Sequence, residues 1–467
     1  MREARNRAVL YNIVTGGLDA PGSRPFYHTS KLAFGPRLGI AYAPKRFEGK
    51  TVIRAGAGYY YGPGQGEDLI QPIESDRVSI RLDGAAARYP VDSLTAIGNF
   101  NINTATGIGV RAYAPGYSVP EKVLSYTFGI QQTLPGQAVA TVAYVGSQGR
   151  NLFLRSIANV VTGVTPAGAA IRQFGNRFAE IDYKTTGGTD HYDSLQTTLN
   201  RRFSKGFTLG GQWTWGHSIG NTGGSNESQT THSPFDFSLD RGNNAFDVRH
   251  SVNFTALYEL PFARQHRFGG WDLGGVWNAR SGLPVDVRVT RPDIVHVNAA
   301  GQVFNSAQAG TQPVINVPGG GASRDVRRPD VVAGVSPFIK NADKTVFLNP
   351  AAFAIPAPGT FGNLGRGAIH GPGISQFDLT LSKRFKISER FNAQFRAEAY
   401  NIFNRANFDA PVARLANVLG TSANQLQPGR SYTTSTAGTF GQIQGTVEKV
   451  VGLGASRQVQ FSMRLSF

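Results

Sequence analysis

Acidic and histidine side chains of the kind that bind cations gather in one stretch of the sequence. Asp236, Asp240, Asp247 and His250 all lie in one polar segment. Carboxylate and imidazole groups in such a group can coordinate a divalent cation. The same residue types more often form hydrogen-bond networks in loops and on polar strand faces. We therefore predict no metal site.

Motifs of known catalytic sites do not accompany these residues. The stretch GAGYYYG, from Gly56 to Gly62, has the wrong spacing for a dinucleotide-binding fingerprint, and neither G-x-S-x-G nor H-E-x-x-H occurs. The chain contains no cysteine, which excludes a thiolate nucleophile and a thiolate metal site. We predict that the protein is not an enzyme, has no catalytic residues and uses no cofactor.

The net charge of +17 raises the question of nucleic-acid binding. The basic residues are spread along the chain in small groups, such as Arg201 with Arg202 and Arg327 with Arg328. No long basic run, zinc-finger spacing or RNP-like aromatic motif is present. We therefore predict a polar surface with a positive bias and no nucleic-acid partner.

The composition favours strands over helices. The 467 residues include 57 glycines and 11% aromatic residues, and 40% of the residues are hydrophobic. No apolar stretch reaches the length of about 18 residues that a transmembrane helix requires. This criterion does not detect the strands of a membrane barrel, because their residues alternate and give a weak hydropathy signal. The opening MREARNRAVLYNIVTGG has no apolar core or cleavage site of a signal peptide.

The last residues of the chain, RQVQFSMRLSF, alternate strictly. One face carries Val459, Phe461, Met463, Leu465 and Phe467, and polar residues stand between them. This period of two predicts a β-strand with one apolar face and one polar face. The same pattern recurs in RFNAQFRAEAYNIF and in nine further segments: PRLGIAYAP, KTVIRAGAGYYYG, EKVLSYTFGIQQTL, QAVATVAYVG, YDSLQTTLNRRF, GFTLGGQWTWGHS, DVRHSVNFTALYEL, GGWDLGGVWNAR and ISQFDLTLSKRFKI. We count eleven candidate strands.

The connections between these segments alternate between short and long. The short ones are PKRFEG, LPGQ, SK, PFARQHRF and SE, and the long ones cover residues 62–120, 147–190, 219–245, 281–373 and 403–455. An outer-membrane barrel has short turns on its periplasmic side and long loops outside. The sequence therefore predicts an all-β protein, a transmembrane antiparallel up-and-down β-barrel.

In such a barrel the apolar faces contact lipid and the polar faces line a lumen. The alternation predicts five lumen-facing candidates for substrate contact: Arg54, Asn253, Gln394, Arg396 and Glu398. The alternative, which we expect more often, is a water-covered wall whose charges pair with one another.

Several of these segments resemble TonB-dependent outer-membrane receptors. FGPRLGIAYAPKRFEGKTVIRAGAGYYYG looks like their mid-barrel strands, while YDSLQTTLNRRFSKGFTLGGQWTWGHSIGN, NPAAFAIPAPGTFGNLGRGAIHGPG and FDLTLSKRFKISERFNAQFRAEAYNIFNRANF resemble the Oar-like branch. The resemblance runs from about Leu32 to Phe467. It implies that Val459, Phe461, Met463, Leu465 and Phe467 form the signal that the barrel assembly machinery reads.

The resemblance also implies that this sequence covers part of a larger barrel. Members of the family have about 22 strands, preceded by a signal peptide, a TonB box and a plug domain. Eleven strands over residues 32–467 then correspond to the C-terminal half of the barrel, with the plug domain absent. We expect residues 1–31 to be a partial N-terminal segment, in which VLYNIV (residues 9–14) is the remnant of a preceding strand and loop.

The resemblance implies the barrel part of a transporter in the cell outer membrane that imports a large substrate. Its partners would be outer-membrane lipid, the barrel assembly machinery and, only through the missing plug domain, the TonB complex. Two alternatives stay open at this point. One is a passive outer-membrane pore or adhesin, and the other is a soluble secreted β-protein that binds glycans. The substrate-binding residues stay unknown, because the loops carry no diagnostic motif.

Overall fold

The computed structural model describes residues 10–23, 25–62, 94–95, 106–222, 231–261, 269–318, 327–340, 345–388, 391–416, 419, 426–448 and 453–467. Most of the predicted connection over 62–120 lies outside the described residues. No helix in the described part of the chain combines the length and the apolar character needed to cross a membrane.

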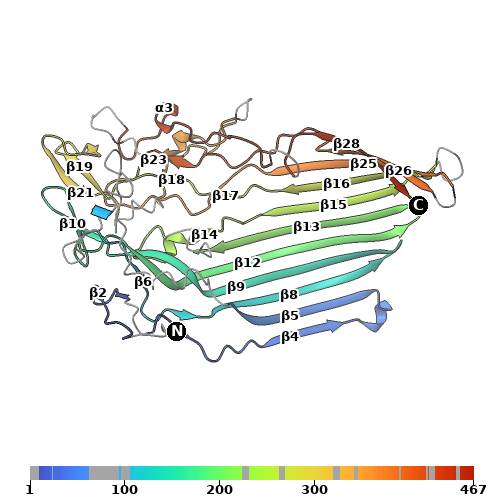
Figure 1. The fold of residues 1–467 in the computed structure, drawn as a ribbon, viewed down its shortest axis with the longest axis horizontal. Coiled ribbons are helices and arrows are strands. Elements are labelled where there is room, and N and C mark those ends of the chain that lie inside the picture. Colours follow the sequence, from blue (N-terminus) through green and yellow to red (C-terminus); the bar gives the residue numbers. More distant parts are fainter. Residues whose placement is uncertain are drawn as a thin grey trace.

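One large antiparallel sheet dominates the structure (Figure 1). Its strands are β4 (Arg37–Tyr42), β5 (Thr51–Gly62), β8 (Glu121–Leu134), β9 (Ala138–Ala158), β12 (Ile181–Ser204), β13 (Phe207–Gly220), β15 (His250–Glu259), β16 (Trp271–Arg280), β25 (Ile374–Lys386), β26 (Asn392–Tyr400) and β28 (Gln458–Ser466). Two short strands, β6 (Arg111–Tyr113) and β14 (Gly242–Asn243), add to β12 and β13. The prediction of an all-β, eleven-stranded antiparallel arrangement is confirmed.

The eleven strands neighbour one another in the order of the sequence, from β4 to β28. Every pair is antiparallel, as the registers of β4 with β5 and of β26 with β28 show at the two ends. The first and the last strand of an odd-numbered meander run in the same direction. Within the described residues, neither β4 nor β28 pairs with a strand on its outer edge.

The sheet has short turns at one end and long connections at the other, as Figure 1 shows. The tightest turn joins β12 to β13, where Ser204 pairs with Phe207. Its two central residues, Lys205 and Gly206, have φ angles of 52° and 80°. Positive φ at both positions matches the twist of the flanking strands, which is why this hairpin closes in two residues.

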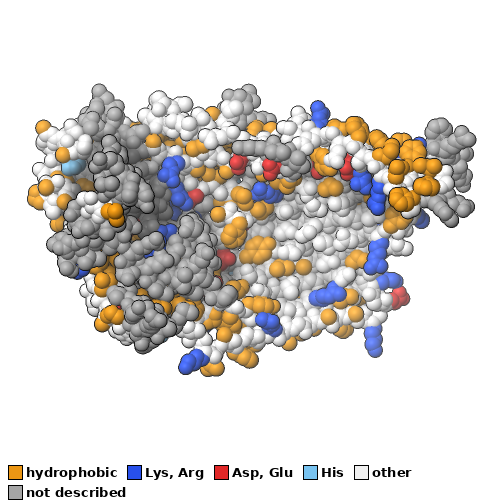
Figure 2. Space-filling view, viewed as in Figure 1, with side chains coloured by type: hydrophobic (Ala, Val, Ile, Leu, Met, Phe, Trp, Pro, Cys, Tyr) orange, Lys and Arg blue, Asp and Glu red, His pale blue; other side chains and the backbone are white. Residues whose placement is uncertain are grey.

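The two faces of the sheet differ in chemistry, because side chains alternate along each strand. In the ladder of β15 with β16, Phe254 pairs with Trp277 on one side and Asn253 pairs with Asn278 on the other. We call these sides the apolar face and the polar face. In Figure 2 the face turned to the viewer is mostly white, the colour of uncharged polar side chains and backbone, with scattered hydrophobic side chains and with acidic and basic ones over part of it.

The prediction of a long connection over 147–190 is wrong, because both flanking strands extend into this range. Strand β9 continues to Ala158 and β12 begins at Ile181, so only residues 159–180 connect them. Loops cover both faces of these strand ends, where Phe153, Leu154 and Ile157 are buried, and the alternation that marks a half-buried strand disappears. The register between β9 and β12 also shifts at Gly188, which interrupts the alternation further. The two strands lie so close there that a Cβ at position 188 would lie 2.5 Å from the Leu152 carbonyl oxygen.

The other long connections fold into small elements. They contain β7 (Ser118–Val119), β17 (Pro284–Val285), β18 (Arg288–Val289), β19 (Ile294–Asn298), β20 (Val303–Phe304), β21 (Thr311–Ile315), β22 (Asp330–Val331), β23 (Phe353–Ala354), β24 (Ile369–His370), β27 (Arg414–Leu415), η4 (Phe237–Asp240), η7 (Pro350–Ala352) and α3 (Thr434–Ala437). The connection 159–180 contains β10 (Val161–Val164) and β11 (Ala170–Arg172), and β3 (His28–Thr29) lies in the N-terminal segment before β4. The helix η1 (Lys45–Phe47) lies in the turn after β4.

The connections 281–373 and 401–457 share one hydrophobic core. Leu348, Phe353 and Ile355 of the first pack with Leu415 and Phe440 of the second, and all five are buried. Parallel pairing of β18 with β27 joins the two connections through their backbones. We call this unit the loop core. Its elements β18, β23 and α3 lie toward the long-loop end of the sheet (Figure 1).

The N-terminal segment packs on the extended ends of β9 and β12. Strands β1 (Tyr11–Asn12) and β2 (Gly17–Leu18) form a two-stranded hairpin of their own. Tyr11 is fully buried beside Phe178 and Ile181. Tyr11 and Asn12 pair with β2 and not with the large sheet. The interpretation of residues 9–14 as the remnant of a barrel strand stays a prediction.

Candidate functional site

The polar face carries all five lumen-facing candidates of the sequence. The registers from β5 to β26 place Arg54, Asn253, Gln394, Arg396 and Glu398 on the side of Asn278. Gln394, Arg396 and Glu398 are neighbours on β26 and line one open depression of about 370 Å³. Asn253 lies on β15, and Arg54 lies on β5 toward the other edge of the sheet. The structure thus brings three of the five together.

The charges on β26 pair with each other. The Arg396 guanidinium lies 3.6 Å from the Glu398 carboxylate, and these side chains are 46% and 18% exposed. Arg54 donates a hydrogen bond to Gln131, and Asn253 donates one to Asn278. Such pairing along a wet face is the arrangement expected of a wall in contact with water.

The sequence reasoning missed a second group of charges on the same face. Arg384 on β25 contacts Glu259 on β15 at 3.0 Å and Asp272 on β16 at 3.1 Å. The Ser382 hydroxyl adds a hydrogen bond of 3.3 Å to Asp272. Each of these residues occupies a polar position of an alternating segment, which is the only sequence signal for them. The ladder register is what joins three strands into one charged group.

The four residues considered for a cation serve separate roles. Asp236 caps η4 by accepting a hydrogen bond from the Ser238 amide at 2.8 Å, and His250 stacks on Trp213. Asp247 is buried and accepts from the Ser218 amide at 2.7 Å, with His217 at 3.1 Å. The described residues contain no group of three or more acidic or histidine side chains placed to hold a metal ion.

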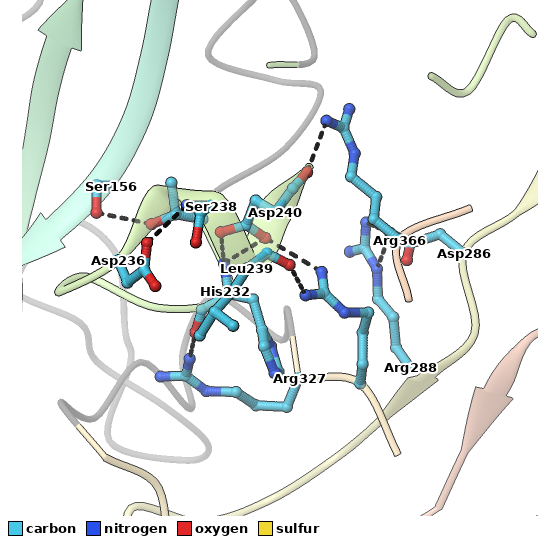
Figure 3. A network of polar contacts seen from close by, with 12 residues as sticks. Ser156, His232, Asp236, Ser238, Leu239, Asp240, Asp286, Arg288, Arg327 and Arg366 are labelled. Atoms are coloured by element: carbon cyan, nitrogen blue, oxygen red, sulfur yellow. Dashed lines mark hydrogen bonds and ion pairs between the residues drawn. The ribbon is translucent and has the colours of Figure 1, made fainter. Parts of the chain in front are cut away.

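Asp240 belongs to a network of buried arginines between the connections 221–249 and 281–373 (Figure 3). Both oxygens of its carboxylate accept the single N–H of the His232 amide, at 2.9 and 2.8 Å, and Oδ1 also accepts from Arg328 at 3.1 Å. Burial raises the pKa of Asp240, while Arg328 and the His232 amide act in the opposite direction. Arg366 donates to the carbonyl groups of Gly220, Thr222 and Asp240 and so ties this network to the end of β13.

A second buried ionic group centres on Asp182 at the start of β12. Arg155 and Lys184 each lie 3.1 Å from its carboxylate, and Arg111 lies 3.6 Å away. Asp182 and Lys184 are buried, so this group holds β6, β9 and β12 together away from bulk water. Three cations on one carboxylate give the ends of these strands a fixed register where hydrophobic alternation is lost.

The last strand presents its apolar residues outward. Val459, Phe461, Met463 and Leu465 are between 58% and 69% exposed, and Phe467 is 95% exposed. Pairing with β26 sets the register, with Leu465 opposite Ala393 and Phe461 opposite Ala397. A water-soluble sheet would not leave such a row uncovered, whereas lipid covers it at no cost in free energy.

Comparison with known proteins identifies the family. Residues 1–460 match the family described as outer membrane beta-barrel domain, and the protein therefore belongs to this family. Its location is the outer membrane, where membrane lipid surrounds it. The alternative of a soluble secreted glycan-binding protein is wrong for this reason. No curated protein sequence matches the chain.

Several solved structures of outer-membrane proteins are similar to the chain over a part of their length. They include the closed form of the ferric-catecholate import receptor of Escherichia coli K12, with 10% identity, a TM-score of 0.34, and coverage of 85% of this chain and 33% of the receptor. An iron transporter from Neisseria meningitidis gives 11% identity, a TM-score of 0.37 and coverage of 92% and 39%. The ferripyoverdine receptor of the Pseudomonas aeruginosa outer membrane gives 8%, 0.36, and coverage of 92% and 32%. The chain thus spans about a third of the length of these proteins.

Proposed function

We propose that the chain forms the wall and the external loops of a TonB-dependent outer-membrane transporter, of the Oar-like branch, that imports a large substrate. The observation that carries the proposal is the combination of two features. A polar face with paired, partly exposed charges lies behind a continuous apolar face, and connections with their own hydrophobic core stand at one end. The first suits a water-filled interior, and the second suits a shaped external surface that captures a ligand.

In this proposal Arg54, Asn253, Gln394, Arg396 and Glu398 line the lumen. Gln394, Arg396 and Glu398 line a common depression with Asp272, so they are the first candidates for contact with a passing substrate. The proposed role of Val459, Phe461, Met463, Leu465 and Phe467 is recognition by the barrel assembly machinery. Their exposure along one face leaves them accessible to another membrane protein.

The directions of β4 and β28 limit the number of further strands with which the sheet can close into a barrel. Because β4 and β28 run in the same direction, an antiparallel meander closes only if an odd number of further strands is inserted between them. We propose that a preceding half of the same barrel supplies them, for a total of about 22 strands. In this proposal the TonB complex acts through a plug domain.

A passive pore or an adhesin on the same barrel is the competing function. Conductance across a planar bilayer distinguishes a passive pore from a transporter. The measurement uses the protein purified from its native outer membrane together with any polypeptide that accompanies it. A plugged transporter passes no steady current in buffer and opens reversibly in urea, when the plug unfolds. A steady current in buffer would instead establish the passive pore. Loss of cell attachment on gene deletion, with no ligand-uptake defect, would establish the adhesin.

A further inference from the structure

Four arginines of the connection 281–373 are buried. They are Arg291, Arg327, Arg328 and Arg366, and each is 5% exposed or less. Among the described residues, the only carboxylate in an ion pair with any of them is that of Asp240, on Arg328. A buried cation needs either a counter-charge or hydrogen-bond acceptors for its N–H groups. The four can therefore be compared by how their guanidinium groups are satisfied.

Three of the four serve the fold. Arg291 donates to the carbonyl groups of Asn316, Pro356, Ala357 and Thr360 and to the Asn316 side chain, all between 2.9 and 3.2 Å. Arg366 donates three hydrogen bonds to carbonyl groups. Arg328 is held by Asp240 and by the Leu239 carbonyl. These side chains staple neighbouring loop segments together.

Arg327 differs from the other three in its Nη2, because in Arg291 and Arg328 only the buried Nε lacks a hydrogen-bond partner. Its Nη1 donates to the His232 carbonyl, as Figure 3 shows, and its ring neighbour is Phe361, whose centroid lies 6.0 Å away. Its Nε and Nη2 are buried and have no hydrogen-bond partner. These two nitrogens form one edge of the guanidinium, and this edge is the fork that binds a carboxylate through two parallel hydrogen bonds.

We propose that Arg327 is an anion-binding residue, and that its free Nε and Nη2 edge takes the carboxylate group of a small ligand within the external loops. The site is distinct from the polar face of the sheet, and it does not depend on whether the barrel is a transporter or a passive pore. The bound carboxylate supplies the acceptors that the fork lacks and a negative charge beside three other buried cations.

The electrostatics around Arg327 agree with this assignment. Burial lowers the pKa of Arg327 to about 10, and the more distant carboxylates of Glu180, Asp293 and Asp240 offset that effect only in part. Burial also lowers the pKa of Arg291 to about 10, and the positive charge of Arg327 contributes. Arg327 therefore keeps its positive charge at neutral pH, and a bound anion relieves the repulsion between Arg327 and Arg291.

The test uses the full protein and acetate as the probe. Amide hydrogen exchange is measured in acetate and in chloride at equal ionic strength, with inorganic phosphate as a third arm. We expect acetate to slow exchange in residues 231–240 and 327–331 with a saturable dependence on concentration. Phosphate can also bind the fork through two hydrogen bonds, but it should act more weakly because its larger charge costs more to desolvate in a buried site. A stronger effect of phosphate would assign the site to a phosphate group and overturn the carboxylate.

Three variants make the test specific to Arg327. Arg327→Gln should abolish the acetate effect, while Arg430→Gln, at an exposed arginine outside the cluster, should leave it intact. Arg327→Lys keeps the charge and loses the fork, so the apparent Kd should rise about tenfold or more. If Arg327→Gln fails to fold, the lysine variant alone decides. Equal exchange in acetate and chloride, or an unchanged Kd in Arg327→Lys, would refute the proposal.

Discussion

The sheet and the loop core bury their hydrophobic side chains by different means. On the apolar face of the sheet, Phe254 and Trp277 remain 37% and 39% exposed, although they lie in the middle of paired strands. In the loop core, Leu348 and Phe353 are 0% exposed, although few long strands surround them. The apolar side chains of the sheet become covered only by lipid. Those of the loop core are covered by one another, although they come from residues far apart in sequence.

The charged residues divide in the same way. Pairs on the polar face, such as Arg396 with Glu398, keep contact with water. The carboxylates of Asp182, at the start of β12, and of Asp240, in the connection 221–249, are buried. A water-exposed pair adds little to stability, whereas loss of one member of a buried group leaves an uncompensated charge. The comparison teaches that the long connections have the energetics of a folded globular protein, and the strands have those of a membrane wall.

The largest expected effect is on the loop core. Phe353→Ala removes a ring that contacts Phe440 at 5.4 Å between centroids, and it should destabilise the loop core by about 3 to 5 kcal/mol. Hydrogen exchange should rise in residues 346–356 and 432–440 and stay unchanged in β12 and β13. Phe235→Ala, at a ring that is 65% exposed, is the matched control. Equal loss of protection in the sheet would show that the loop core is not a separate unit.

The buried and exposed carboxylates give the second prediction. Asp182→Asn takes the negative charge away from Arg155 and Lys184 and should cost about 3 kcal/mol or more at the ends of β9 and β12. Glu398→Gln on the polar face should cost about 1 kcal/mol or less, because water screens its pair. Urea titration of hydrogen-exchange protection measures both. Similar costs for the two variants would remove the distinction between buried and wetted charges.

The sheet could be predicted from the sequence because its signal is local. A strand with lipid on one face and water on the other repeats every two residues, so Val459 to Phe467 alone reveal its faces. The five polar-face candidates follow from the same period. The alternation disappears where protein covers both faces, as at Phe153 and Leu154, and there the expected loop over 147–190 was wrong.

The contacts across strands and loops could not be predicted, because they depend on three-dimensional register. Arg384 meets Glu259 and Asp272 through the pairing of β15, β16 and β25. The hydrogen bond of the buried Arg327 guanidinium likewise depends on a residue of another connection, His232. In sequence, Arg327 and Arg328 look like one of several ordinary basic pairs on a surface. A single sequence contains no signal for their burial.

A charge on either face of one strand tests the membrane side of the comparison. Phe254→Arg places a cation in the middle of the apolar face and should cost about 2 to 4 kcal/mol in the bilayer. Asn253→Arg, its neighbour on the polar face, should be tolerated. The assembled fraction in outer membranes, measured by the shift of gel mobility on heating, reports both variants. Equal assembly of the two would argue that the faces have been assigned the wrong way round.

The smallest effect concerns pH. His370 in β24 is half-buried, its Nε2 has no hydrogen-bond partner, and burial lowers its pKa, with Arg249 and His217 adding to the effect and Asp247 opposing it. The unfolded state then binds the proton more readily than the folded state. Stability of this region should therefore fall as the pH drops below about 6.5 toward the lowered pKa of the folded state.

The effect of His370 is measured as the change in urea midpoint of the region between pH 7 and pH 5, with exchange rates corrected for intrinsic pH dependence. His370→Gln should reduce this change, since the glutamine does not titrate, while His28→Gln at an exposed histidine should preserve it. A pH response that survives in His370→Gln would move the proton-sensitive group elsewhere in the loop region. A response that also appears in β12 and β13 would instead couple the loop core to the wall, and it would weaken the division between the two regions.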